Sequence, residues 1–196
     1  MKTTALVPAA ILLAALPLCG QAPPSRTSGP VRLELTLAYT ALRSNTIPGG
    51  SACIWMQGGK AEFRAAFSNN LGLVGEVAGY HARDINSAHE DISLVSYLFG
   101  PRLSWRVRRF TPFAQVLLGG VHGFDAIFPS RGNSTTAPDA FAMAAGGGVN
   151  IDLSRHLALR AFQADYFLTS LPNNSTNLQN SLRLGAGIVF KLSLRE

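Results

Sequence analysis

The sequence of 196 residues predicts an all-β fold, a single eight-stranded antiparallel up-and-down transmembrane β-barrel. Three observations support this prediction: apolar and polar residues alternate with a period of two, the predicted strands are long, and short and long connections alternate along the chain. Alternating side chains point to opposite faces of a strand, so each strand has one apolar face and one polar face. The sequence shows no convincing helical period past residue 30, which favours an all-β fold.

The chain begins with a predicted secretory signal peptide, residues 1–22. Met1 and Lys2 supply its positive end, and residues 5–18 form an apolar stretch that is too short to cross a bilayer comfortably as a helix. Small residues precede an expected cleavage after Ala22. A short membrane anchor is the alternative.

The two cysteines allow little cysteine chemistry. Cys19 lies at the end of the apolar stretch and raises the alternative of an acylated lipoprotein signal, although Leu18 stands where such signals have a small residue. Cleavage after residue 22 leaves only Cys53, so we expect no disulfide within the chain and no cysteine-based metal site. Residues 23–30 are rich in Pro and Ser and form a lead-in to the barrel domain, residues 31–192, which a short tail, residues 193–196, follows.

The first and last predicted strands show the alternation clearly. In residues 31–43, "VRLELTLAYTALR", the apolar residues occupy the odd positions and mostly polar residues the even ones. Residues 181–191, "SLRLGAGIVFK", repeat the pattern. The other six predicted strands are residues 55–67, 71–82, 92–106, 111–124, 140–153 and 157–168. Strands of this length suit a tilted crossing of a bilayer.

The connections between these strands alternate strictly, beginning with a long one. The short connections are residues 68–70, 107–109 and 154–156, and the long ones are residues 44–53, 83–91, 125–139 and 169–180. The long connections are rich in Asn, Ser, Thr, Pro and Gly, as solvated loops are. An up-and-down barrel with all tight turns at one end produces this alternation.

Three consecutive glycines, residues 146–148, lie within the strand 140–153. Neither a flexible linker nor a phosphate-binding loop fits the alternation around them, because a nucleotide-binding loop needs a helix to follow it. We expect them to form a tightly curved part of the barrel wall and to leave room for lumen side chains.

Several segments resemble the small outer-membrane β-barrel family that includes the OmpA-type transmembrane domain and OmpX-like proteins. They are "NNLGLVGEVAGY", "YLFGPRLSW", "PFAQVLLGGVH", "AAGGGVNIDLSRHLALRAFQADY" and "LRLGAGIVF". The resemblance implies an outer-membrane location in a Gram-negative bacterium, with lipid and lipopolysaccharide around the barrel and assembly by the barrel-assembly machinery and periplasmic chaperones. It also implies a C-terminal assembly signal, here Gly185, Ile188 and Phe190, although this chain continues past the last aromatic residue.

The polar faces of the strands predict a charged barrel interior. Because an eight-stranded barrel is only wide enough for its own side chains, balanced charges are expected to pair and fill it. The alternative is a narrow ion path that these pairs gate. The predicted lumen residues are Glu34, Lys60, Glu62, Arg64, Glu76, Arg102, Asp165 and Arg183.

Aromatic residues cluster near the predicted strand ends, as the girdles of transmembrane barrels do. Those expected near the tight turns are Phe67, Trp105, Phe113 and Phe190, and those expected near the long loops are Tyr39, Trp55, Phe141 and Tyr166.

The sequence predicts no catalytic, cofactor or metal site. Some small outer-membrane barrels are lipid A deacylases or palmitoyl transferases that use a serine with a histidine and an acidic partner, but the residues that could do so here have no nucleophile motif or fixed spacing. They are His81, Ser87, His89, Glu90, Asp91 and His122. A two-histidine metal site in the same loop is an equally open alternative.

The net charge of +6 does not predict nucleic-acid binding, because the charges are scattered and only Arg106, Arg108 and Arg109 cluster. We therefore expect a non-enzymatic integral outer-membrane protein with a role in envelope integrity or in surface contacts. The longest loop, residues 125–139 with Phe128 and Arg131, is the candidate for an extracellular ligand. A lipid A-modifying enzyme, a small pore and a soluble periplasmic ligand-binding barrel are the alternatives.

Overall fold

The computed structural model describes residues 32–44, 54–83, 91–124, 128–130, 133–135, 139–171 and 178–193. These residues form strands, turns and loops, and they contain no helix long and apolar enough to cross a membrane. The strands are β1 (Arg32–Ser44), β2 (Ile54–Ala66), β3 (Leu71–Ala82), β4 (Ile92–Ser104), β5 (Phe110–Phe124), β6 (Phe128–Ser130), β7 (Asn133–Thr135), β8 (Asp139–Asp152), β9 (Leu157–Thr169) and β10 (Gln179–Ser193).

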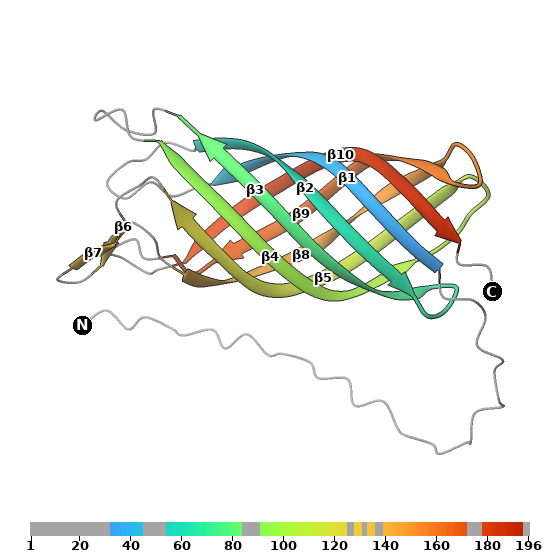
Figure 1. The fold of residues 1–196 in the computed structure, drawn as a ribbon, viewed down its shortest axis with the longest axis horizontal. Helices are drawn as coiled ribbons and strands as arrows, with labels where there is room; N and C mark the ends of the chain where they lie inside the picture. The colour runs from blue at the N-terminus through green and yellow to red at the C-terminus, as the bar shows by residue number, and fades with distance from the viewer. Residues whose placement is uncertain are drawn as a thin grey trace, which may run out of the picture.

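Eight of these described strands close into one antiparallel barrel in the order β1-β10-β9-β8-β5-β4-β3-β2 (Figure 1). The first and last strands complete the ring, with Arg32 opposite Ser193 and Ser44 opposite Ser181. The other two described strands, β6 and β7, form a small hairpin beyond one end of the barrel, within the predicted loop 125–139. The predicted eight-stranded up-and-down barrel is therefore confirmed, and the hairpin is an addition to it.

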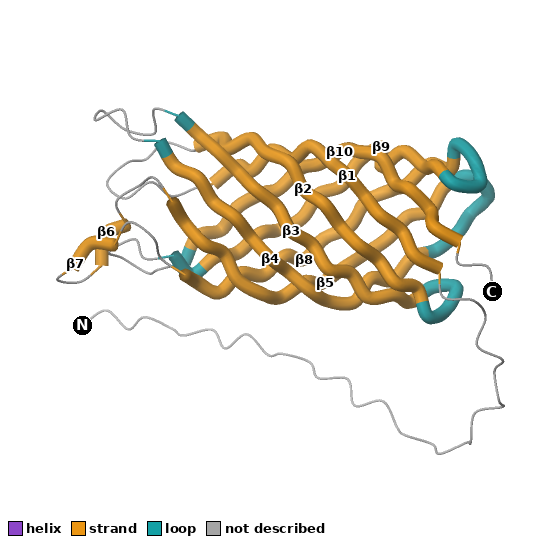
Figure 2. Tube along the Cα trace, viewed as in Figure 1, coloured by secondary structure: helices purple, strands orange, loops and turns teal. Residues whose placement is uncertain are grey.

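The predicted strand boundaries agree with the observed ones to within two residues, and the tight turns lie together at one end of the barrel (Figure 2). Two of these turns begin with a serine that caps the turn. The Ser68 hydroxyl accepts a hydrogen bond from the Leu71 amide at 3.0 Å, and the Ser154 hydroxyl accepts one from the Leu157 amide at 3.1 Å. Serine is suited to turns because its hydroxyl can bond to nearby backbone amides.

The third tight turn is closed by paired backbone hydrogen bonds between Val107 and Phe110, of 2.8 and 2.9 Å. These bonds form an isolated bridge that encloses a two-residue turn between β4 and β5, and Arg108 in that turn has a φ of 54°. Two-residue hairpins favour this left-handed conformation because it matches the twist of the strands, although glycine adopts it more easily than arginine.

The two faces of the barrel wall differ sharply in polarity. Large apolar side chains such as Phe63, Val77 and Phe99 are exposed on the outside, while Glu62 and Arg102 are buried inside. A water-soluble barrel would have the opposite arrangement, because exposed apolar bands of this extent are unfavourable in water. The outward apolar wall therefore fits the predicted transmembrane barrel.

Strand β9 contains a β-bulge that changes which residues face inward. Val149 is opposite Phe162, whereas the next residue, Asn150, is opposite Arg160. Ala161 is thus an extra residue in β9. In a regular strand, residues three positions apart face opposite sides. Because of the extra residue, Arg160 and Gln163 both face inward, and both are buried.

The glycine segment lies in the wall of β8, where neighbouring backbone comes very close. A Cβ atom on Gly146 would lie 2.2 Å from the Ala164 carbonyl oxygen, and one on Gly148 would lie 2.3 Å from the Phe162 carbonyl oxygen. Strands this close leave no space for a side chain. The expectation that these glycines leave room for lumen side chains agrees with this geometry, because the same Cβ atoms would lie 2.6 Å from Asp165 Oδ1 and 3.0 Å from the Phe113 ring.

Several sequence predictions lie outside the described residues. They are the signal peptide (residues 1–22), the lead-in (residues 23–30), the final residues 194–196, Cys19, Cys53, Ser87, His89, Glu90 and the side chains of Phe128 and Arg131.

Candidate functional site: the charge network inside the barrel

Seven charged side chains form one connected network in the barrel interior, which we call the central network. Lys60 and Glu62 are joined at 2.7 Å, Glu62 and Arg102 at 2.7 Å, and Glu62 also pairs with Arg160. Lys60 also pairs with Glu76 at 3.1 Å, and Glu76 pairs with Arg183 at 2.5 Å. Arg183 in turn pairs with Asp165 at 2.7 Å. Every one of these side chains is at most 2% exposed.

Neutral polar side chains complete the hydrogen bonding of the central network. Gln115 accepts a hydrogen bond from Arg102 Nε at 2.9 Å, and Gln163 donates one to Asp165 at 2.7 Å. The Tyr80 hydroxyl accepts one from Arg183 at 3.1 Å. Buried charges are tolerated only when they are paired and hydrogen-bonded in this way.

The central network contains four cations and three carboxylates, so it carries one formal positive charge more than it can pair. The aromatic ring of Phe113 contacts two of these cations: its centre is 4.4 Å from the guanidinium carbon of Arg102 and 4.8 Å from that of Arg160. The negative face of an aromatic ring attracts a cation, most strongly away from water. Phe113 therefore stabilises the two arginines that share the Oε2 oxygen of Glu62.

The interpretation of Phe113 as an outward girdle residue is thus wrong, because its side chain is 4% exposed and lies inside the barrel. Its position on β5 has the same parity as Gln115 and Leu117, which are also buried inside. The polar residue Gln115 was the sequence signal for the inward face of this strand.

Arg160 belongs to the central network, although the alternation in the sequence does not predict it. Strict alternation from Asp165 places Arg160 on the outside, but the bulge at Ala161 turns it inward. The sequence carried a sign of this irregularity, since Arg160 and Gln163 are two polar residues three positions apart in a strand where polar residues otherwise alternate.

Two of the eight predicted lumen residues lie apart from the central network. Glu34 and Arg64 face inward near the tight-turn end and pair with each other at 3.1 Å. The six others, Lys60, Glu62, Glu76, Arg102, Asp165 and Arg183, belong to the central network.

Mostly apolar side chains, with the buried uncharged residues Ser96, Thr169 and Gln179 among them, fill the described barrel interior towards the long-loop end. Leu42, Met56, Leu94, Val121 and Phe167 belong to this cluster, and all are at most 5% exposed. The Phe167 ring also contacts the central network, since the Arg183 guanidinium lies 5.4 Å from its centre. An apolar layer with no lining charges is a barrier to ions.

The other predicted girdle residues are outward-facing and exposed, but they do not all lie at strand ends. Phe67 and Trp105 flank tight turns, whereas Trp55 and Phe141 lie at the long-loop ends of β2 and β8. Tyr39, by contrast, lies near the middle of β1 and not at its end. The predicted girdle residues Tyr166 and Phe190 are also exposed on the outer wall. Of the predicted assembly-signal residues, Ile188 is exposed on the outer wall as well, and Gly185 of β10 is paired with Thr40 of β1.

The histidines near the long-loop end form two separate pairs. His81 Nδ1 is 3.0 Å from the Ser93 hydroxyl, and His122 Nδ1 is 2.6 Å from an Asp139 carboxylate oxygen. A hydrolase triad requires one histidine to contact both the serine and the acid. Within the described residues these contacts are divided between two histidines, and no group of three or more metal-binding side chains is present there.

Comparisons with known proteins agree with this architecture. The family described as "outer membrane protein beta-barrel domain" matches residues 11–190. No curated protein matches the sequence.

Solved structures with this fold include the attachment invasion locus protein Ail of Yersinia pestis, with 20% identity over 84% of this chain and 100% of that chain and a TM-score of 0.58. Neisserial surface protein A has 13% identity over 85% of this chain and 100% of that chain, with a TM-score of 0.58. OprG of Pseudomonas aeruginosa has 12% identity over 84% of this chain and 97% of that chain, with a TM-score of 0.60.

Proposed function

The chain belongs to the outer membrane protein beta-barrel domain family, and from this premise we propose that it is a non-enzymatic integral outer-membrane protein whose closed barrel holds its long loops at the cell surface. The observation that carries the proposal is the filled interior, in which the central network adjoins an apolar layer. Such an interior favours a rigid scaffold over a pore.

The proposal places the tight turns in the periplasm and the long loops outside the cell, as in other transmembrane barrels. The hairpin β6–β7 extends from the long-loop end (Figure 1), so it is the part of the described chain best placed for contacts with other molecules. One similar structure, Ail of Yersinia pestis, has been solved in complex with the heparin analogue sucrose octasulfate. This is consistent with surface contacts as one use of the fold.

Membrane fractionation followed by gel electrophoresis tests the barrel and its location. The protein should be in the outer-membrane fraction, and boiling should change its mobility because heat unfolds a closed barrel. Recovery in the water-soluble fraction would support the soluble periplasmic barrel instead.

A loop variant distinguishes the two possible roles, surface contact and envelope integrity. Replacing residues 126–138 with a short Gly-Ser linker should leave heat-modifiable mobility intact and abolish binding of cells to a surface ligand. A strain that lacks the whole protein, but not the loop variant, should show increased outer-membrane permeability if the barrel itself supports the envelope. Unchanged behaviour of both strains in both assays would contradict the proposal.

The pore and enzyme alternatives each have a direct test. The purified protein should give no discrete conductance steps in planar bilayers, and steady single-channel steps would refute a closed interior. Overproduction of the protein should leave lipid A unchanged by mass spectrometry. If lipid A loses or gains an acyl chain, and the Ser93→Ala variant abolishes that change, the enzymatic alternative replaces this proposal.

A further inference from the structure

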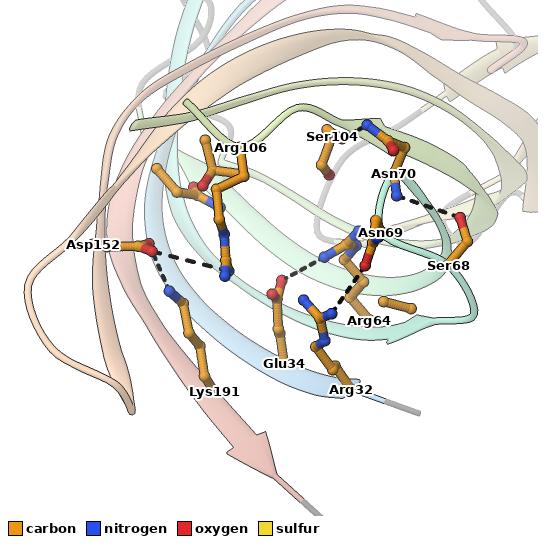
Figure 3. A pocket seen from close by; sticks show the side chains of 13 residues that line it. Arg32, Glu34, Arg64, Ser68, Asn69, Asn70, Ser104, Arg106, Asp152 and Lys191 are labelled. Atoms are coloured by element: carbon orange, nitrogen blue, oxygen red, sulfur yellow. Dashed lines mark hydrogen bonds and ion pairs between the residues drawn. The ribbon is translucent and has the colours of Figure 1, made fainter. Parts of the chain in front are cut away.

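A polar cavity of about 360 Å³ opens at the tight-turn end of the barrel, and we call it the vestibule (Figure 3). The turn between β2 and β3, the end of β4 and the ends of β1, β8 and β10 supply its wall. One wall residue, Asn150, accepts a hydrogen bond of 3.1 Å from Arg160 of the central network. The vestibule therefore ends at the paired charges that fill the barrel.

The vestibule wall carries more positive than negative charge. Its cations are Arg32, Arg64, Arg106 and Lys191, and its carboxylates are Glu34 and Asp152, which gives a formal charge of +2. A concave site with walls of low dielectric constant concentrates the field of such charges. The vestibule is thus attractive to anions.

Two of these cations keep hydrogen-bonding capacity for a ligand. Arg106 is 3.9 Å from Asp152, and about half of its side chain (52%) is exposed. Arg32 donates a hydrogen bond of 3.0 Å to the Asn69 side chain, which is neutral. By contrast, Lys191 holds Asp152 closely at 2.6 Å. The two arginines that lack a close carboxylate come from different elements, Arg32 from the start of β1 and Arg106 from the turn that follows β4.

Two buried polar atoms in the wall also have no hydrogen-bond partner among the described residues. They are Arg64 Nε and Thr111 Oγ1, and Arg64 as a whole is 7% exposed. Both atoms are covered by the wall itself, and Arg64 Nε lies beside Gly72, so neither counts among the donors that face the cavity.

The neighbouring tight turns add further positive charge around the opening. Arg108 and Arg109 follow Arg106 in one turn, and Arg155 lies in another. The residues of these two turns, 105–109 and 153–156, include no carboxylate. This rim steers anions towards the vestibule, and the steering weakens as salt is added.

We propose that the vestibule is a binding site for a phosphate group, held between Arg32 and Arg106. Guanidinium groups bind phosphate with paired, charge-assisted hydrogen bonds, which suits two arginines that line one small cavity and keep donors for a ligand. The phosphate group belongs either to a small soluble molecule or to a phospholipid headgroup at the periplasmic surface of the outer membrane. Because the central network closes the inner end, the site retains the ligand and does not conduct it.

Titration of the purified full chain in zwitterionic detergent with inorganic phosphate, followed by calorimetry at constant ionic strength, tests the proposal. Saturable binding is expected, and Arg106→Gln and Arg32→Gln should each weaken it about tenfold or more. The matched control is Arg155→Gln, which removes the same charge from a turn that does not line the vestibule and should change binding less than about twofold.

A gain of affinity provides a second test. Asp152 competes with phosphate for Arg106, so Asp152→Asn should tighten phosphate binding several-fold. Heat-modifiable mobility of each variant reports that the barrel is still folded. Absence of saturable binding at millimolar phosphate, or an equal loss with Arg155→Gln and Arg106→Gln, would overturn the proposal.

Nanodiscs distinguish the two sources of the phosphate group. If a headgroup occupies the site, inorganic phosphate should bind the protein in a detergent that carries no phosphate group but not in nanodiscs of phosphatidylglycerol. If the ligand is soluble, phosphate should bind equally in that detergent and in the nanodiscs. Because binding is measured on isolated protein, its failure would leave the proposed surface role untouched, and failure of that role would leave the binding result untouched.

Discussion

Glu62 is the carboxylate on which most of the central network depends, so its removal should strongly destabilise the barrel. It accepts hydrogen bonds from Lys60, Arg102 and Arg160, and its side chain is fully buried. The Glu62→Gln variant keeps the shape of the side chain but leaves these three buried cations around a neutral amide. The excess charge of the central network then rises from one to two.

Removing one partner of a buried ion pair costs about 3–5 kcal/mol, because the remaining charge stays buried without compensation. A loss of this size is a large fraction of the 5–15 kcal/mol that stabilises a typical domain. We therefore expect Glu62→Gln to lower the free energy of unfolding by about 3–5 kcal/mol. Urea-induced unfolding in lipid vesicles, followed by tryptophan fluorescence and by gel mobility, measures this loss.

Two control variants separate burial from charge balance. Glu34→Gln removes a carboxylate that pairs with one cation, Arg64, and is 12% exposed, so it should cost less than Glu62→Gln, which takes the carboxylate away from three buried cations. Lys60→Met removes a cation from a network with one cation too many, and Glu62 and Glu76 keep their arginine partners. It should therefore cost less than Glu62→Gln. A loss below about 1 kcal/mol for Glu62→Gln, or a larger loss for Lys60→Met, would refute the reasoning.

Three further variants test other parts of the barrel by the same unfolding measurement. Phe113→Leu should lose about 1–3 kcal/mol, because the ring beneath two arginines disappears, whereas Phe99→Leu on the outer wall should lose less; equal losses would contradict a cation–π role. Gly148→Ala places a Cβ 2.3 Å from a backbone oxygen and should prevent or severely weaken folding, while Gly75→Ala, whose Cβ meets nothing within 4 Å, should be tolerated. Arg108→Gly should be neutral or stabilising by up to about 1 kcal/mol, because glycine adopts the φ of 54° without strain; a clear loss of stability would show that the arginine side chain contributes to the turn.

The sequence predicted the barrel well because its main signals are local and repeated. Each strand carries its own alternation, and each tight turn has its own turn residues, such as Ser68 and Ser154. An error at one strand end does not alter the others. The eight strands, their order and their antiparallel pairing therefore follow from patterns that can be seen within about a dozen residues at a time.

The interior was predicted less completely because it depends on contacts between distant strands. Arg160 and Glu62 are 98 positions apart in the sequence, and a bulge at one residue of β9 decides whether they meet. Phe113 shows the same limit, since an aromatic residue near a strand end suits an outer girdle as well as an inner cation–π contact. Alternation assigns a side chain to a face only as long as the register continues unbroken.

The narrow interior also explains where function can lie in this protein. In this barrel the described side chains fill the middle of the space that the eight strands enclose, which disfavours the passage of a ligand. Each cation of the central network repels a second cation, while an anion that entered from the vestibule would have to separate Glu62 and Glu76 from the arginines that hold them. That separation would leave buried charges unpaired, at a cost far above the gain from binding. Our proposals therefore place recognition at the two ends of the barrel, the long loops at one end and the positively charged vestibule at the other.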